Sequence, residues 1–406
     1  GAIEAVHADD EVVQVIEAQR GVYADAVVGQ QRVADAEHEC QCHGFDSPLG
    51  AVTRASATVL SRPGCTESAH PPSSVATIRS GNGSRGARCW FSIRTMLHSL
   101  IAKGFRSQAA RSMRLVPSTG VADVPREPVF LYVHVPFCEV LCPFCSFHRV
   151  KHRDDKARTY FAALRQEIAL YHDRGFRFSG VYVGGGTPTS APEELAETLA
   201  QLRSYGPLGE VSVETNPKDL QPRVLEMLVQ AGVQRLSVGV QSFDDGLLRE
   251  MDRYEKYGGS AEIRERLAYA AARFRTLNVD MIYNLPHQTE AMLEADLDSV
   301  LAGPANQVSF YPLMSSATVE RKMGRTMGLP DRSRLHRYYG RVLARLRPDF
   351  TASSAWCFNR GGHGIDEYVV QSPDYLGLGS GAFGNLGGRV YASTFSLRAY
   401  VERVER

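Results

Sequence analysis

Between residues 128 and 346 the chain repeats one unit six times, a short apolar strand followed by an amphipathic helix. The first strand, Val129–Val135, is rich in β-branched and aromatic residues, a composition typical of a buried strand. In the helix expected over Ala157–His172, large apolar residues recur every three or four positions. The next strands are expected over Gly180–Val183, Glu210–Glu214, Arg235–Val240, Val279–Tyr283 and Gln307–Tyr311, and the next helices over Pro192–Leu202, Leu220–Ala231, Ala261–Phe274, Glu290–Leu301 and Arg332–Leu346. Such alternation requires a parallel sheet with right-handed crossovers, so we predict an α/β barrel, open or closed.

The composition narrows the class of protein. The 406 residues include 46 basic and 45 acidic side chains, for a formal charge of +1. A chain this close to neutral is not built chiefly to bind nucleic-acid phosphates, so no nucleic-acid partner is expected. No run of eighteen apolar residues would span a membrane, and the first 30 residues show no secretory signal. We therefore expect a cytoplasmic protein whose cysteines stay reduced.

The chain divides into three parts by residue composition and hydrophobic periodicity. Residues 1–125 lack a sustained period, and their middle is crowded with Ser, Gly, Pro, Thr and Arg. Such a stretch buries too little apolar surface to offset the entropy of ordering it, so we expect a disordered leader; a basic tail that binds an acidic partner is the alternative. Residues 126–348 hold the barrel, and 349–406 form a C-terminal extension.

Polar or Gly/Pro chemistry follows each of the first five strands. Parallel α/β folds bind ligands at the carboxyl edge of their strands, so these segments are expected to form one site. In chain order they are the cysteine cluster, Gly184–Pro188, Glu214–Pro217, Gln241–Phe243, and Asp280 with Asn284–Pro286.

The cysteine cluster is the run Cys138-x3-Cys142-x2-Cys145. Zinc requires four ligands, usually from paired Cys-x2-Cys units, and only His134 and His148 stand near enough to substitute for the missing pair. A disulfide would leave one thiol over. An iron–sulfur cluster held by three thiolates fits better, because its fourth iron is left open for a ligand.

Together these segments resemble the radical S-adenosylmethionine (radical SAM) superfamily. The resemblance is to the branch of oxygen-independent coproporphyrinogen III oxidases and haem chaperones, and it covers residues 128 to 400. It is carried by Tyr132–Cys145, Gly184–Pro188, Glu214-x-Asn-Pro217, Arg235–Phe243, Val279-Asp-x-Ile282 and Leu376–Ala382. The fold that it implies is a partial (βα)6 barrel with a C-terminal extension.

The resemblance also implies roles for residues. Cys138, Cys142 and Cys145 would ligate a [4Fe-4S] cluster that binds SAM and, once reduced, cleaves it to a 5′-deoxyadenosyl radical. Other matched positions would bind one SAM molecule or two. These are Gly185, Gly186 and Thr187 near the SAM amino group, Tyr132 and Phe144 beside the cluster, Glu214 on SAM, Gln241, Arg253 and Asp280 on a second SAM, and Phe383 against the adenine. For Phe144 and Phe383 core packing is the alternative, and for Arg253 it is exposure to solvent.

The implied reaction is hydrogen abstraction from a tetrapyrrole or another bulky substrate, with an electron donor such as flavodoxin or ferredoxin. Oxidative decarboxylation and two-SAM methyl transfer both remain open, and a haem chaperone that keeps the cluster without turnover is the alternative. Two departures bear on this choice: Phe147 replaces the fourth cysteine of the oxidases, and Ile365–Val370 replaces a His-Asn-x-x-Tyr-Trp element of the chaperones. Relatives often continue into a helical C-terminal domain, so we expect this chain to be a fragment or to lack that lid.

Overall fold

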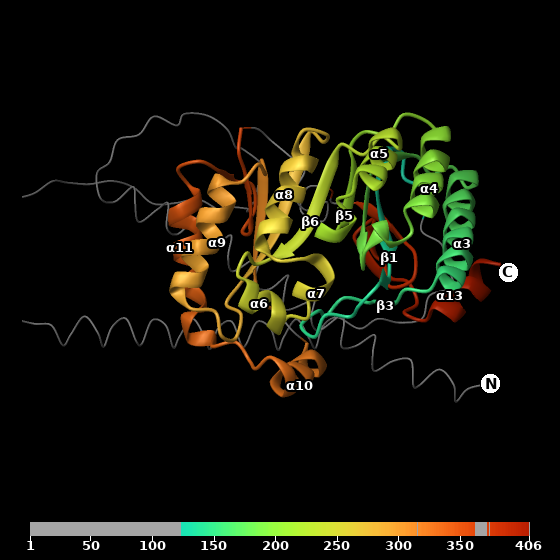
Figure 1. Ribbon diagram of the computed structural model, residues 1–406. Coiled ribbons are helices and arrows are strands. Elements are labelled where there is room, and N and C mark those ends of the chain that lie inside the picture. Colours follow the sequence, from blue (N-terminus) through green and yellow to red (C-terminus); the bar gives the residue numbers. More distant parts are fainter. Residues whose placement is uncertain (1–122, 315, 362–371, 373, 406) are drawn as a thin grey trace, which may run out of the picture. The chain divides into compact units, whose positions relative to one another are not determined.

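The computed structural model describes residues 123–314, 316–361, 372 and 374–405 (Figure 1). Apart from residues 123–125, the expected leader lies outside the described residues, and so does Ile365–Val370. The division of the chain at residues 125 and 348 stays a prediction.

An eleven-stranded sheet organises this part of the chain, in the order β13-β12-β11-β1-β4-β5-β6-β7-β8-β10-β9. The six strands in its centre are parallel and follow one another in chain order, which confirms the predicted α/β repeat. The described strands end in two edges, β13 and β9, so the barrel is open. The central strands are β1 (Val129–Val135), β4 (Phe178–Gly185), β5 (Val211–Thr215), β6 (Arg235–Gln241), β7 (Thr276–Tyr283) and β8 (Gln307–Pro312).

Six long helices follow these strands and lie along the outside of the sheet (Figure 1). The expected helix at Leu220 begins instead at Pro222, because proline is favoured in the first helical turn. The one expected from Arg332 opens with a 3-10 turn, Arg332–Arg334. The long helices are α3 (Asp154–Asp173), α4 (Pro192–Ser204), α5 (Pro222–Gln230), α8 (Ser260–Ala271), α9 (Glu290–Ala302) and α11 (Leu335–Leu346). Four further helices were not predicted: α6 (Asp245–Glu250), α7 (Tyr254–Tyr257), α13 (Leu397–Val404) and α10 (Ala317–Thr326), which is one residue longer than α5.

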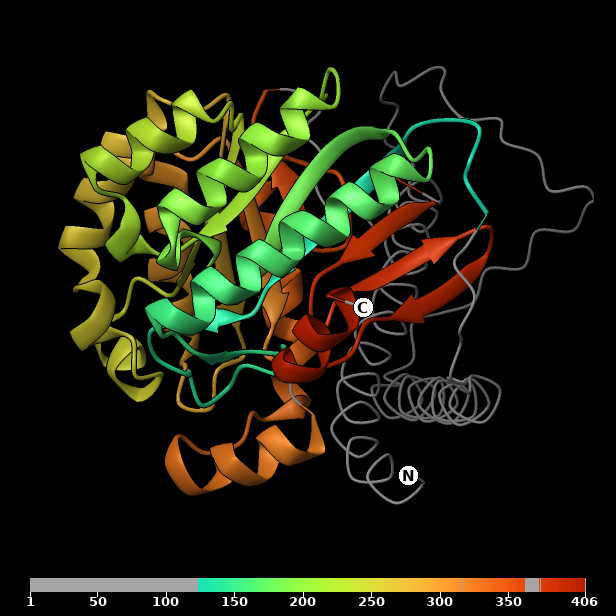
Figure 2. The ribbon, with the colours of Figure 1, turned by 90° about the vertical axis from the view of Figure 1, so that its right-hand side faces the viewer.

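Residues beyond 348 extend the sheet at both edges. At one edge β11 (Tyr375–Leu378) pairs parallel with β1 and is followed by β12 (Phe383–Leu386) and β13 (Arg389–Ala392), which form a ribbon (Figure 2). At the other, β10 (Cys357–Asn359) and β9 (Thr351–Ala352) pair next to β8. These strands are two to four residues long, too short to show a period in the sequence.

The C-terminal helix α13 packs on α3. The Tyr400 ring lies 5.2 Å from the Tyr160 ring, and the Tyr400 hydroxyl donates to Glu167 Oε2 at 2.6 Å. Glu167 also accepts the Gly379 N–H at 2.9 Å. One partly buried carboxylate therefore holds both the last described helix and the glycine-rich loop after β11.

The inner face of the sheet, away from the helices, is polar although it is buried. Parallel strands covered on both faces usually carry apolar side chains throughout. Here the face toward the helices is apolar, while the inner face has a smaller apolar cluster at β1 and β11, formed by Phe130, Tyr132 and Tyr375, and carries buried polar side chains on the strands from β5 to β10. Arg235, 2% exposed, donates from Nε to Gln307 Oε1 at 2.7 Å and from Nη1 to Ser212 Oγ at 2.9 Å. Other buried polar residues on this face are Ser237, Asn278, Ser309 and Asn359.

Replacing Arg235 by Met should destabilise the fold. The change removes both hydrogen bonds and leaves buried polar atoms of Gln307 and Ser212 without this donor, at a cost of about 2–4 kcal/mol in the free energy of unfolding. Urea unfolding measures this. The control is Arg223→Met, because the Arg223 side chain is 79% exposed and its loss should change stability by less than about 0.5 kcal/mol. Equal losses in the two variants would contradict the structural role of Arg235.

Candidate functional site

The cysteine loop leaves the carboxyl end of β1 and is closed by a short pair of strands. In this pair β2 (Phe137–Cys138) lies parallel to β3 (Val150–Lys151). Cys138 and Cys142 are buried, Cys145 is partly exposed, and all three are free thiols. Within the described ranges no three His, Cys, Asp or Glu side chains converge as they would on a single metal ion.

Three cationic side chains surround this loop, and each has a buried nitrogen without a hydrogen-bond partner. The orphaned atoms are Arg149 Nε, Arg253 Nε and Lys256 Nζ. Burial lowers the pKa of Lys256, and negative charges on thiolates at Cys142 and Cys138 would act in the opposite direction. Burial raises the pKa of the Cys138 thiol to about 12, so a bare thiolate is unfavourable there and needs a metal to stabilise it. Three thiols among cations that each keep one buried nitrogen without a partner fit an anionic, thiolate-ligated iron–sulfur cluster.

The glycine loop after β4 packs directly against the cysteine loop. The Gly186 N–H donates to Val135 O at 2.8 Å, and a Cβ at residue 186 would lie 2.6 Å from Phe137 O. Gly185 has a φ of +112°, which only glycine adopts readily. Position 186 has no room for a side chain because it lies so close to Phe137, the residue before the first cysteine.

Glu214, at the end of β5, faces the same loop. It accepts hydrogen bonds from the Tyr182 hydroxyl at 2.8 Å and the Gly185 N–H at 3.0 Å. Burial, with the nearby Asp280 charge as a second cause, raises the pKa of the Glu214 carboxyl to about 7. A hydrogen-bonded carboxylate therefore sits beside the glycine loop.

Gln241, Arg253 and Asp280 come together around Gly239 of β6. Arg253 is 4% exposed, so it does not face solvent, and its guanidinium donates to Gly239 O and to Cys142 Sγ, the latter at 3.5 Å. Asp280 lies opposite Gly239 in the register of β7. Gln241 has a φ of +76°, and a Cβ on Gly239 would be 3.0 Å from its Nε2. A non-glycine residue in this conformation stores strain of the kind that clusters at functional sites.

Three of the predicted residues are aromatic: Tyr132, Phe144 and Phe383. The Tyr132 hydroxyl and His134 Nδ1 share a hydrogen bond of 2.8 Å, and both residues belong to β1. Phe144 is part of the main apolar cluster. Phe383 stacks edge-on at 6.0 Å with Phe395, whose ring lies 5.3 Å from that of His148. Phe383 thus reaches the cysteine loop only through two other rings.

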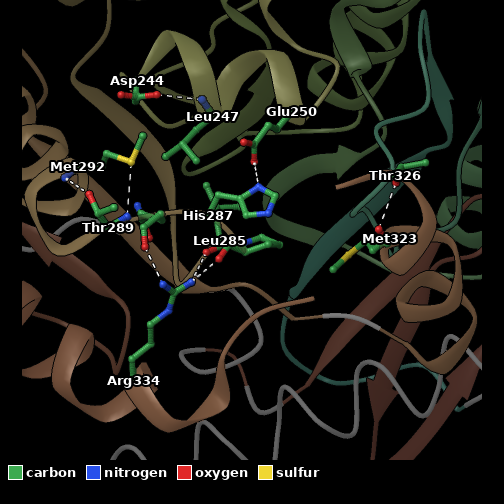
Figure 3. Close-up of polar contacts among 12 residues, drawn as sticks. Asp244, Leu247, Glu250, Leu285, His287, Thr289, Met292, Met323, Thr326 and Arg334 are labelled. Atoms are coloured by element: carbon green, nitrogen blue, oxygen red, sulfur yellow. Dashed lines mark hydrogen bonds and ion pairs between the residues drawn. The ribbon is translucent and has the colours of Figure 1, made fainter. Parts of the chain in front are cut away.

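Figure 3 shows the loop after β7, to which Arg334 donates hydrogen bonds. Its guanidinium donates to the carbonyl oxygens of Leu285 at 2.5 Å and Gln288 at 2.7 Å. On the same loop, His287 Nδ1 lies 2.9 Å from a carboxylate oxygen of Glu250. Arg334 was not predicted, because nothing in an arginine-rich stretch marks one residue as a clamp.

Two further residues were missed by the sequence analysis. Buried Asp296 of α9 accepts the Phe243 N–H at 2.6 Å and the Ser242 hydroxyl at 3.0 Å, and so holds the turn that begins at the strained Gln241. Asn216, 9% exposed, lies between Thr187 and Arg253. Asn216 could have been found, since it belongs to the Glu214-x-Asn-Pro segment at a strand end.

Comparison with known proteins identifies the class. The profile of the radical SAM superfamily matches residues 132–300. The haem chaperone HemW of Mycobacterium tuberculosis is 30% identical over 283 residues, which are 66% of this chain and 72% of that protein. The oxygen-independent coproporphyrinogen III oxidase of Bradyrhizobium diazoefficiens is 38% identical over 183 residues, but the match spans only 43% of this chain and 40% of that enzyme.

A solved structure agrees. Coproporphyrinogen III oxidase (HemN) from Escherichia coli, described as a radical SAM enzyme, matches with a TM-score of 0.62 and 26% identity over 68% of this chain and 69% of that one. The chain therefore belongs to the radical SAM superfamily. Within it, the chain is a member of the family that contains HemW and the oxygen-independent coproporphyrinogen III oxidases. Its cofactors are accordingly a [4Fe-4S] cluster and SAM. No helix in the described ranges is long and apolar enough to cross a membrane.

The stability of the protein should depend on pH through Glu214. The carboxyl has a pKa of 4.5 in the unfolded chain and about 7 in the folded one, so the folded state holds the proton more tightly. The stability that this provides is fully present below pH 4.5 and is lost as the pH rises to about 7. Glu214→Gln stays neutral, so between pH 5 and 8 its free energy of unfolding should fall by about 1–3 kcal/mol less than that of the wild type.

Urea unfolding of both proteins across this range measures the difference. The exposed Glu226 provides the matched control, since Glu226→Gln should follow the wild-type curve. Parallel curves for wild type and Glu214→Gln would show that the carboxyl is not perturbed.

The glycine loop predicts a second outcome. Gly186→Ala places a Cβ 2.6 Å from Phe137 O, so the cysteine loop must shift, and the iron bound after anaerobic reconstitution should fall severalfold. Gly340 of α11 has no heavy atom within 4 Å of an added Cβ, so Gly340→Ala should keep full iron content and be up to about 1 kcal/mol more stable. Full iron loading of Gly186→Ala would disprove the close fit of the two loops.

Proposed function

We propose that this protein is a radical SAM enzyme that abstracts hydrogen from a tetrapyrrole-type substrate. The observation that carries the proposal is the cysteine loop: three free thiols at the carboxyl edge of a parallel sheet, surrounded by buried cationic nitrogens that lack partners. In this proposal Cys138, Cys142 and Cys145 ligate the cluster.

When bound and reduced, the cluster supplies one electron that cleaves SAM to methionine and a 5′-deoxyadenosyl radical. The protein's part is to bind and orient. The Gly185–Thr187 segment lets the ligand approach the backbone, and Glu214 would accept a hydrogen bond from a SAM hydroxyl. Gln241, Arg253 and Asp280 would hold a second SAM molecule, while Tyr132, Phe144 and Phe383 would line the site.

The substrate is the finer part of this proposal. A hydrogen atom would leave the substrate for the 5′-deoxyadenosyl radical, which becomes 5′-deoxyadenosine. The substrate radical would then lose CO2 and pass one electron to an external electron acceptor. Alternatively, it would take up the methyl-derived carbon of a second SAM, which leaves as S-adenosylhomocysteine. Phe147, which is 57% exposed, stands at the position of the fourth cysteine of the oxidases. The absence of a cysteine there favours methyl transfer over oxidative decarboxylation. We place the reaction in the cytoplasm, with flavodoxin or ferredoxin as the electron donor.

A haem chaperone is the second candidate. The match to HemW of Mycobacterium tuberculosis covers 72% of that protein, whereas the match to the Bradyrhizobium oxidase covers 40% of that enzyme. The longer coverage supports the chaperone as an alternative. In this alternative the cluster is kept without radical turnover, and haem binds in stoichiometric amount.

One assay separates these functions. The anaerobically reconstituted protein, with dithionite and labelled SAM, should form 5′-deoxyadenosine, and Cys142→Ala should lower the rate at least about 100-fold because the cofactor supplies the chemistry. Mass spectrometry of added tetrapyrroles then distinguishes loss of CO2 from arrival of the label.

The control is Cys357→Ala, a buried cysteine in β10 outside the loop, which should keep its rate. If the cluster-loaded wild type forms no 5′-deoxyadenosine but binds one haem, the radical enzyme is rejected and the haem chaperone is supported.

A further inference from the structure

A chain of hydrogen bonds connects two of the three cysteines across three strand ends. Arg253 Nη1 donates to Cys142 Sγ at 3.5 Å, and Nη2 donates to Asn216 Oδ1 at 3.2 Å. Asn216 Nδ2 donates to Thr187 Oγ1 at 2.6 Å, and Thr187 Oγ1 donates to Cys138 Sγ at 3.7 Å. The linking residues follow β4, β5 and β6.

The chemistry of arginine sets the direction of this chain. A guanidinium can only donate, so the amide oxygen of Asn216 must face Arg253 and its NH2 group must face Thr187. The Thr187 oxygen then accepts from Asn216, and its own hydrogen is left to point at Cys138. Both sulfurs therefore receive donors, as thiolates require.

Burial and backbone geometry hold the chain in place. Thr187, Asn216 and Arg253 are 5%, 9% and 4% exposed, so water does not compete well for their hydrogen bonds, and bonds in series polarise one another. Asn216 precedes Pro217, which favours its extended backbone (φ −116°, ψ 159°). The residue before Arg253, Asp252, is left-handed, with a φ of +55°.

We propose that Asn216 is a positioning residue that aligns Thr187 and Arg253 on two cluster thiolates and thereby raises the reduction potential of the cluster. The inference rests on the proposed function, which makes Cys138 and Cys142 cluster ligands. Hydrogen bonds to cluster sulfurs stabilise the reduced cluster, which carries one more negative charge, and so raise its potential. The positive charge of Arg253 acts in the same direction. Without Asn216, the hydroxyl of Thr187 can rotate away from Cys138 and the guanidinium of Arg253 loses one anchor.

The test is a redox titration of the anaerobically reconstituted protein, followed by electron paramagnetic resonance. Asn216→Ala should shift the midpoint potential to a more negative value. Thr187→Val, which replaces only the hydroxyl, should shift it in the same direction by a smaller amount. Thr187→Ser keeps the hydroxyl and should restore the wild-type potential.

Thr189 offers the matched control. It is buried and bonded to Thr215 and Asp219, at 2.7 and 2.6 Å, so Thr189→Val makes the same chemical change without contact to a cysteine. It should lower stability and leave the potential unchanged.

Each result decides between alternatives. Wild-type potentials in cluster-loaded Asn216→Ala and Thr187→Val would overturn the inference while leaving the proposed function intact, provided that the wild type cleaves SAM. A wild type that binds no cluster would overturn both. If Asn216→Ala cannot hold its cluster, the comparison of Thr187→Val with Thr187→Ser decides, and equal potentials in that pair would reject the inference.

Discussion

The parallel register of the six central strands is the constraint on which the site depends. Because neighbouring strands run in the same direction, all their carboxyl ends meet at one edge, and segments more than a hundred residues apart become neighbours. Cys142 and Arg253 illustrate this: they lie on the loops after β1 and β6, and the guanidinium of one contacts the sulfur of the other. A change of register by one residue would turn the inner polar face toward the helices.

The same register explains the unusual core. The face of the sheet toward the helices is apolar and carries the hydrophobic stabilisation. The inner face carries buried Arg235, Gln307 and Asn278, each hydrogen-bonded to neighbours. A buried polar group is tolerated only when it has partners, so this face holds its side chains in defined positions. Asp280 and Glu214 lie on the same face, nearer the carboxyl ends of the strands, so the polar network below them also fixes their positions.

Around the cysteine loop, by contrast, some buried polar groups lack partners: one nitrogen each of Arg149, Arg253 and Lys256 has no hydrogen bond. Such groups are costly in a folded protein unless an anionic group satisfies them. The [4Fe-4S] cluster of the radical SAM superfamily, held by thiolates, supplies that negative charge.

Local patterns in the sequence determined the repeat of strands and helices, the three-cysteine loop and the Gly-rich turn, since each depends on residues close together in the chain. β1 was predicted to the residue. Only the tertiary structure decided the short strands β9 to β13, whose pairing depends on a pre-existing edge, the burial of Arg253, and the clamp formed by Arg334. It also revealed Asn216 as the link between two cysteine contacts. A hydrogen bond between residues 37 positions apart leaves no period or spacing in the sequence, because it depends on where the strands end in space.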